Sequence, residues 1–209
     1  MAPELVTGLT ADRVRANLAE IRDEIARPEV EILAAVKYVA LEELGTLHEA
    51  GVTVVGENRA QELERKAAEH PEFAWDFIGQ LQSRKVKVIA PLVRRIHSVS
   101  SDSAVEQLAK HARDDLELFL QVNIAGEDAK AGVAPDEVAG YLDKLRFSGL
   151  TVMPPAADEP ENSRRWFAAE RERADRHELP GLSMGTSQDY AVAAQEGATV
   201  VRIGNRLYR

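Results

Sequence analysis

Short apolar runs, rich in β-branched residues, recur along the chain, and a stretch with helical periodicity follows most of them. Eight such runs lie at residues 31–36, 53–55, 75–78, 95–97, 118–122, 149–152, 181–183 and 199–202. A short apolar run that is bounded by turn residues is typical of a buried strand in a parallel sheet. The pattern therefore predicts eight parallel strands that alternate with helices.

Apolar residues three and four positions apart mark the intervening helices. The clearest helix follows Ser101, because one of its faces combines Ala104, Val105, Leu108, Ala109 and Ala112. Another is predicted from Arg13 to Ala26, before the first strand. Ser, Asn and Pro are favoured at helix starts, and Gly just after helix ends. The later helices are therefore expected to begin at Asn58, Ser101, Pro135 with Asp136, and Ser187, and Gly197 is expected to close the last of these.

Eight strand–helix units in 209 residues match the lower size limit of a (β/α)8 barrel, the TIM barrel. An open, doubly wound sheet is the alternative, but it usually has fewer strands. A closed barrel of this size uses the entire chain, so residues 1–209 are expected to form a single α/β domain. The polar, Pro-rich segment 154–162 is expected to be a surface loop, because too little chain flanks it for two cores.

Acidic and basic residues are interspersed, with 35 Asp and Glu against 26 Lys and Arg, and a net charge of −9. The chain lacks the basic stripe that nucleic-acid binding requires. The absence of cysteine excludes a disulfide framework, a thiolate metal site and a cysteine nucleophile. The five histidines are scattered, so no metal site is expected. No secretory signal or membrane-spanning apolar run is visible, so we expect a cytoplasmic protein.

The active site of a TIM barrel lies at the carboxyl ends of its strands, and the first strand ends at Lys37. This side chain has two interpretations. It is either a lysine that extends from the barrel rim into water, or an amine whose pKa is lowered by desolvation and that forms an imine with an aldehyde. The residue alone does not decide between them.

Two loops at the same end of the barrel have features of a phosphate site. A helix is expected to start at Ser187, after the seventh strand, and free N–H groups at a helix start attract anions. Gly204 and Asn205 follow the eighth strand, and a glycine lets backbone amides approach a phosphate closely. The alternatives are a plain helix cap for Ser187, which is compatible with anion binding, and a structural salt bridge for Arg202 at the strand end.

Barrel closure makes the first strand the neighbour of the eighth, so Lys37 is expected to lie close to both loops. An amine beside a phosphate site meets the requirements of pyridoxal 5′-phosphate (PLP), which carries an aldehyde and a phosphate. A barrel that binds another phosphorylated ligand, without an imine, is the alternative.

Several ordered motifs extend this picture. They are AVKY around Lys37, GENRAQE at 56–62, WDFIGQLQSRK at 75–85, IHSVSS at 96–101, QVN at 121–123, KAG at 130–132, LSMGTSQD at 182–189 and VRIGN at 201–205. By these motifs, which span nearly the whole chain, the sequence resembles the YggS/PROSC family of pyridoxal phosphate homeostasis proteins. The resemblance implies a barrel like the N-terminal domain of alanine racemase, of PLP fold type III, with PLP as the cofactor.

The resemblance also implies roles for particular residues. Lys37 matches the lysine that holds PLP as a Schiff base, and Arg202 matches the arginine that faces the pyridine nitrogen. The other PLP-binding residues that it implies are Asn58 near the cofactor, Ser187, Gly204 and Asn205 near the phosphate, and Ser183 and Met184 in the same motif.

The sequence departs from the family pattern in several places. Val36 precedes the lysine where Ser or Thr is usual, Gln80 stands where His is common, and Asn205 replaces a usual Thr. The last change removes a hydroxyl that could contact phosphate. The RLYR ending and the short loop after the sixth strand also differ. These departures concern the affinity for PLP.

The resemblance implies a role in PLP homeostasis, with PLP-dependent apoenzymes as acceptors. An amino-acid racemase, or another weak PLP enzyme, is the alternative. Racemisation needs a base on each face of the substrate, and the pattern supplies no tyrosine as partner to Lys37. A charged Arg202 also disfavours protonation of the pyridine nitrogen and makes the cofactor a poorer electron sink. We therefore expect a PLP carrier rather than a catalyst. The sequence shows no heptad repeat, so a monomer is expected.

Overall fold

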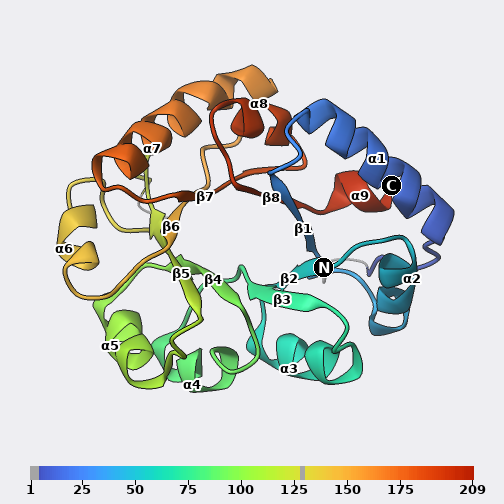
Figure 1. The fold of residues 1–209 in the computed structure, drawn as a ribbon, viewed down its shortest axis with the longest axis horizontal. Coiled ribbons are helices and arrows are strands. Elements are labelled where there is room, and N and C mark those ends of the chain that lie inside the picture. The colour runs from blue at the N-terminus through green and yellow to red at the C-terminus, as the bar shows by residue number, and fades with distance from the viewer. Residues whose placement is uncertain (1–4, 128–129) are drawn as a thin grey trace.

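Eight parallel strands form a closed barrel in the computed structural model, which describes residues 5–127 and 130–209. In barrel order the strands are β1 (Glu31–Ala35), β2 (Val54–Glu57), β3 (Ala74–Phe77), β4 (Arg95–Val99), β5 (Glu117–Val122), β6 (Gly149–Val152), β7 (Gly181–Thr186) and β8 (Val200–Ile203). Each strand pairs with the next, and β8 pairs with β1, so the first and last strands lie side by side (Figure 1). The predicted barrel is confirmed.

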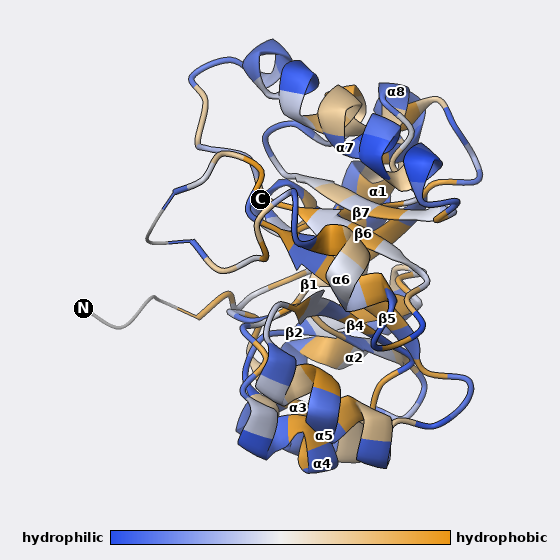
Figure 2. Ribbon diagram, turned by 90° about the vertical axis from the view of Figure 1, so that its left-hand side faces the viewer, coloured by the Kyte–Doolittle hydropathy of each residue, from blue (hydrophilic) through white to orange (hydrophobic). Residues whose placement is uncertain are grey.

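Helices surround the barrel on its outside (Figure 1). They are α1 (Ala11–Ile25), α2 (Leu44–Glu49), α3 (Ala60–Glu69), α4 (Val86–Ile89), α5 (Asp102–His111), α6 (Val138–Leu142), α7 (Arg164–Arg176), α8 (Tyr190–Gln195) and α9 (Asn205–Tyr208). Short 3-10 helices, η1 (Leu41–Glu43), η2 (Ser83–Lys85) and η3 (Pro160–Ser163), precede α2, α4 and α7. Figure 2 shows hydrophilic and hydrophobic residues alternating along α3 and α5, as in helices that pack on one side only. Among the helices of the described residues, none combines the length and the apolar composition that a membrane span requires.

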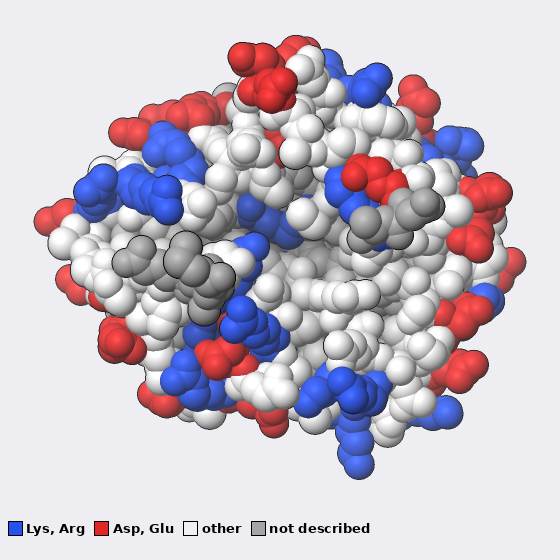
Figure 3. Space-filling view, turned by 180° about the vertical axis from the view of Figure 1, so that it is seen from behind, with Lys and Arg blue, Asp and Glu red and all other residues white. Residues whose placement is uncertain are grey.

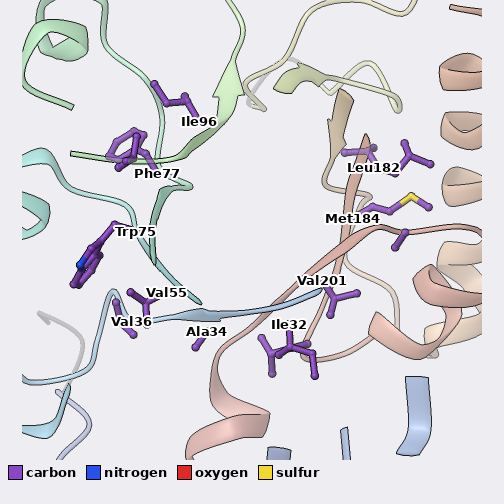
Figure 4. Close-up of a cluster of buried hydrophobic side chains, with 14 of the residues drawn as sticks. Ile32, Ala34, Val36, Val55, Trp75, Phe77, Ile96, Leu182, Met184 and Val201 are labelled. Carbon is purple, nitrogen blue, oxygen red and sulfur yellow. The ribbon is translucent and has the colours of Figure 1, made fainter. Parts of the chain in front are cut away.

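Successive residues of a strand point to opposite sides of the barrel wall. The outward side chains join a hydrophobic core between strands and helices; those of β1 are Ile32 and Ala34, and Val36 just after the strand joins them (Figure 4). Inside the barrel, Leu33 packs against Val54 and Val200. The same alternation places Ala35 and then Lys37 on the inner side, at the carboxyl end of β1.

Two predicted helix boundaries are confirmed. Ser101 caps α5, since its Oγ accepts a hydrogen bond from the backbone N–H of Ala104 at 3.3 Å. Gly197 follows α8 with a φ of +95°, a conformation that glycine adopts without a steric cost at the end of a helix.

Three predicted helix starts are wrong, and in two of them an acidic side chain makes the turn. Arg59, not Asn58, precedes α3, and Glu57 accepts the backbone N–H groups of Asn58 and Arg59 in the turn before the helix. Asp189, not Ser187, precedes α8 and accepts a backbone N–H from the end of β7 at 2.8 Å. Helix α6 begins later than Pro135. In these turns, hydrogen bonds to acidic side chains near the strand ends outweigh the local preference for Asn or Ser at a helix start.

Helix α7 carries a carboxyl group into the interior. The Glu170 side chain is fully buried, and its Oε2 accepts a hydrogen bond from Arg173 Nε at 3.2 Å. Its Oε1 has no partner among the described residues. Burial raises the pKa of Glu170 to about 7, although Arg173 opposes the shift. Between the ordinary pKa of 4.5 and the raised pKa of about 7, Glu170 therefore holds a proton in the folded protein that it has released in the unfolded chain.

The stabilising effect of Glu170→Gln is expected to grow as the pH rises. The folded pKa, about 7, lies above the unfolded value of 4.5, so the wild type loses stability across this window and the neutral amide does not. The difference in free energy of unfolding between Glu170→Gln and the wild type is expected to change by ~3 kcal/mol across this window. Urea unfolding of both proteins at about pH 5 and about pH 8 measures it. A difference between them that stays constant with pH would contradict a buried, titrating Glu170.

Candidate functional site

A cavity of about 500 Å³ opens at the carboxyl ends of the strands. The face opposite to that of Figure 1 is hollowed at its centre, and Lys and Arg side chains gather around the hollow (Figure 3). Six of the eight residues that the sequence placed near a cofactor line the cavity; they are Lys37, Asn58, Ser187, Arg202, Gly204 and Asn205. The barrel thus brings together positions from both ends of the chain.

The other two, Ser183 and Met184, do not line the cavity. The sequence predicted that this strand ends at Ser183, but β7 continues to Thr186. Neighbouring residues therefore point to opposite sides of the barrel wall. Met184 packs outward in the hydrophobic core (Figure 4), and Ser183 points inward to a buried hydrogen-bond network.

Lys37 lies on the cavity wall just beyond β1. Its Nζ is 5.0 Å from the centre of the Tyr38 ring, a cation–π contact. The side chain is exposed, so the protein by itself does not desolvate this amine as the imine hypothesis assumed. The preceding Val36 is buried, and its N–H donates to the carbonyl oxygen of Gly56 at 3.0 Å.

A buried ion pair supports the segment that carries Lys37. Lys66 Nζ, on α3, lies 2.7 Å from Glu57 Oε2 and donates to the carbonyl oxygen of Val36, also at 2.7 Å. The side chains of the pair are 2% and 0% exposed. Glu57 Oε1 accepts the N–H of Asn58 at 2.6 Å. The pair therefore ties the end of β1 to the turn that holds Asn58.

Arg202 reaches the cavity from β8 and forms no ion pair within the described residues. It donates to the carbonyl oxygens of Ser183 at 2.7 Å and Val152 at 3.1 Å, and to Ser183 Oγ at 2.5 Å. Burial lowers the pKa of Arg202 to about 10, so the group stays charged at neutral pH. In place of the salt bridge that the sequence left as an alternative, a buried positive charge borders the cavity.

A chain of hydrogen bonds runs from Arg202 through the barrel interior. Ser183 Oγ lies 2.8 Å from His97 Nδ1, and His97 Nε2 lies 3.0 Å from Asp76 Oδ2. Asp76 accepts a hydrogen bond from Arg94 at 2.8 Å. Burial lowers the pKa of His97, against the opposing effect of Asp76. Ser, His and Asp form the catalytic unit of serine hydrolases, but these three side chains are at most 1% exposed, so a substrate does not reach them. Their hydrogen bonds instead position Arg202.

Ser187 connects the two loops that the sequence assigned to a phosphate. Its Oγ accepts hydrogen bonds from the N–H groups of Gly204 at 3.0 Å and Arg206 at 3.4 Å. Both amides thus point at one place on the cavity wall. A methyl group on Gly204 would meet nothing closer than 3.8 Å, so the wall has open space at this residue.

Sequence reasoning missed several lining residues, which are Tyr38, Ile78, Gly79, Met153, Thr186, Gln188 and Tyr208. Tyr208 lies in the four-residue helix α9, whose position depends on tertiary packing. Its O–H donates to the carbonyl oxygen of Ala35 at 3.2 Å, and its pKa is raised by burial and by the charge of Glu57. Asp76 and His97 had a usable signal, because both are polar residues inside predicted apolar strands.

The donor set indicates what the cavity binds. Among the described residues, no three His, Asp or Glu side chains are grouped so that they could hold a metal ion. The lining combines the amine of Lys37 with the guanidinium of Arg202 and includes no carboxylate. The Asn58 Oδ1 on the wall is buried and has no partner within the described residues. These groups suit an anionic ligand that has a carbonyl group and a hydrogen-bond donor.

A closed barrel with a lysine just beyond its first strand defines the class of protein. The model of the family "alanine racemase, N-terminal domain" matches residues 9–209. A pyridoxal phosphate homeostasis protein of Aquifex aeolicus is 37% identical over 194 residues, which cover 85% of this chain and 85% of that protein. Within that class, the chain belongs to the YggS/PROSC family of pyridoxal phosphate homeostasis proteins.

Two solved structures place the fold among its relatives. PipY of Synechococcus elongatus PCC7942, determined with PLP bound, has a TM-score of 0.82 and 29% identity, covering 94% of this chain and 100% of that one. The lysine/ornithine decarboxylase of Vibrio vulnificus has a TM-score of 0.72 and 16% identity, covering 95% of this chain and 62% of the decarboxylase chain. The likeness to the decarboxylase concerns the fold alone. The family expected from the sequence motifs is confirmed.

Lys66→Met is expected to destabilise the protein by ~3–5 kcal/mol, because it leaves the buried Glu57 carboxylate without its partner. Arg65→Met, one position earlier on α3, removes only an exposed ion pair with Glu62 and is expected to change stability little. Chemical denaturation of the two variants measures the difference. Equal stabilities would show that the buried pair does not support this end of the barrel.

Proposed function

We propose that this protein holds PLP as a Schiff base on Lys37 and serves PLP homeostasis as a carrier. The observation that carries the proposal is one cavity of about 500 Å³ bordered by Lys37, Ser187 and Gly204. That volume lies within the ~300–1,000 Å³ range of small-molecule sites. The family's pyridoxal phosphate homeostasis proteins and the PLP-bound PipY support the same cofactor. The proposed acceptors are cytoplasmic PLP-dependent apoenzymes, and the proposed carrier is a monomer.

The cavity wall offers a group for each part of the cofactor. The Lys37 amine adds to the aldehyde carbon, and the carbonyl oxygen leaves as water when the imine forms. Ser187 and the backbone amides of Gly204 and Asn205 bind the phosphate, and the Gly204 N–H then exchanges its bond to Ser187 Oγ for one to a phosphate oxygen. Asn58 Oδ1, which has no partner within the described residues, accepts a hydrogen bond from the bound molecule.

Arg202 favours a carrier over a catalyst. When bound, PLP supplies an electron sink for carbanions, and the sink is strongest with a protonated pyridine nitrogen. A buried, charged guanidinium disfavours that protonation. Ser183 fixes the guanidinium, and Met184 packs on the other side of the same strand. Under this proposal both residues act on the cofactor indirectly.

The tyrosines of the cavity wall argue against the racemase alternative. Tyr38 follows Lys37 in the chain and contacts its amine, so it supplies no base from another direction. The Tyr208 O–H donates to a backbone carbonyl, and its raised pKa keeps the phenol protonated, so the phenolate that would serve as a base is scarce. A second base opposite Lys37 is therefore lacking among the described tyrosines of the wall.

Addition of PLP to the purified protein is expected to produce the visible absorption band of an imine, and borohydride is expected to fix PLP on Lys37. Lys37→Ala is expected to abolish both the band and the fixed cofactor. Lys130→Ala is a matched control, because Lys130 lies on a neighbouring loop. It does not line the cavity of about 500 Å³ that we assign to PLP, called the PLP cavity below. Absence of the band in the wild type, or fixation on another lysine, would overturn the proposed attachment.

The PLP-loaded protein is expected to show no sustained turnover of amino acids, because Lys37 has no partner base and Arg202 weakens the electron sink. Racemase and transaminase assays over the common L- and D-amino acids measure this. Robust turnover with any of them would replace the carrier function with an enzymatic one.

A further inference from the structure

A second cavity, of about 280 Å³, adjoins the PLP cavity at the same end of the barrel. It lies between the turn after β2 and the loop after β3, and Asn58 and Gln80 line both cavities. Its volume lies just below the ~300–1,000 Å³ range of small-molecule sites. It therefore suits a small ligand that also reaches the wall of the PLP cavity.

Positive charge dominates this second cavity. Arg59, Arg84 and Lys85 line it, and no carboxylate does. None of the three forms an ion pair with residues 5–127 or 130–209, whereas Arg65 nearby on α3 does. The cations gather in a chain whose net charge is −9, and Figure 3 shows most Asp and Glu toward the outline of this face. The like charges repel each other, and an anion bound between them would offset this repulsion.

The donors of the cavity suit phosphate oxygens. Arg84 Nε donates to Gln82 Oε1 at 3.2 Å, and the two terminal nitrogens of Arg84 have no partner within the described residues. A guanidinium fork of this kind binds phosphate oxygens in pairs. The Asn58 carboxamide, on the shared wall, makes no side-chain hydrogen bond in the described part of the chain. It is available to a ligand in either cavity.

We propose that this second cavity is an anion site that binds a phosphate monoester. Its shared wall with the PLP cavity favours a phosphorylated form of vitamin B6, held there as it enters or leaves, and this part rests on the proposed function. Inorganic phosphate is the other source of the same chemistry. Arg59, Arg84 and Lys85 bind the phosphate, and Asn58 and Gln80 separate it from the molecule on Lys37.

The test is calorimetric titration of the PLP-saturated protein with pyridoxine 5′-phosphate, which has no aldehyde and forms no imine. One bound equivalent is expected on the wild type. The variant Arg59→Gln/Arg84→Gln/Lys85→Gln is expected to bind it at least about tenfold more weakly, because it loses the charge-assisted hydrogen bonds. Unchanged affinity in this variant, or no binding to the wild type, would overturn the anion site.

A matched variant controls for net charge. Lys110→Gln/Arg146→Gln/Arg176→Gln removes the same three positive charges from exposed positions outside the cavity, and wild-type affinity is expected. Equal weakening in both variants would reduce the effect to net charge and overturn the site. Titration with inorganic phosphate separates the two sources. Tighter binding of pyridoxine 5′-phosphate supports the vitamer, and equal binding overturns it as the ligand.

The imine band distinguishes failure of this inference from failure of the proposed function. None of the three substituted cations lines the PLP cavity, so the cavity variant is expected to keep the band. A wild type without the band would refute attachment at Lys37. A difference in anion binding between the two triple variants would still support the second site.

Discussion

The pairing of β1 with β8 closes the barrel, and the site depends on this closure. Leu33 lies opposite Arg202 and Ala34 opposite Ile203 in that pairing. The register brings the end of β1, with Lys37, beside the loop that follows β8. Without this pairing, the Lys37 amine and the Arg202 guanidinium, which come from opposite ends of the sequence, would not share one cavity. Parallel strands also all end on the same side, so the turns after β2, β3, β6 and β7 complete one cavity wall.

Two buried polar networks hold this wall in place. The Lys66–Glu57 pair fixes the end of β1 and the turn after β2. The chain from Asp76 through His97 to Ser183 fixes the guanidinium of Arg202. Buried polar groups are costly when unpaired, so each network specifies one arrangement of side chains at the cavity.

Local charge, rather than net charge, decides what this protein binds. The chain carries nine more negative than positive charges, yet carboxylates line neither the larger cavity nor the smaller one beside it. Most acidic side chains lie toward the outline of this face (Figure 3), where water screens them. An acidic surface and an anion-binding face are therefore compatible on one barrel.

The amino-acid sequence by itself determined the eight strands, their alternation with helices and the positions of Lys37, Arg202 and Gly204 at strand ends. These features depend on short-range periodicity, which the burial of strands in a closed barrel imposes on the sequence. The tertiary structure decided that Ser183 faces inward and Met184 outward, that Glu57 holds the turn before α3, and that Lys66 is buried. Each of these depends on where a strand ends or on a partner from another element, and no local pattern encodes that.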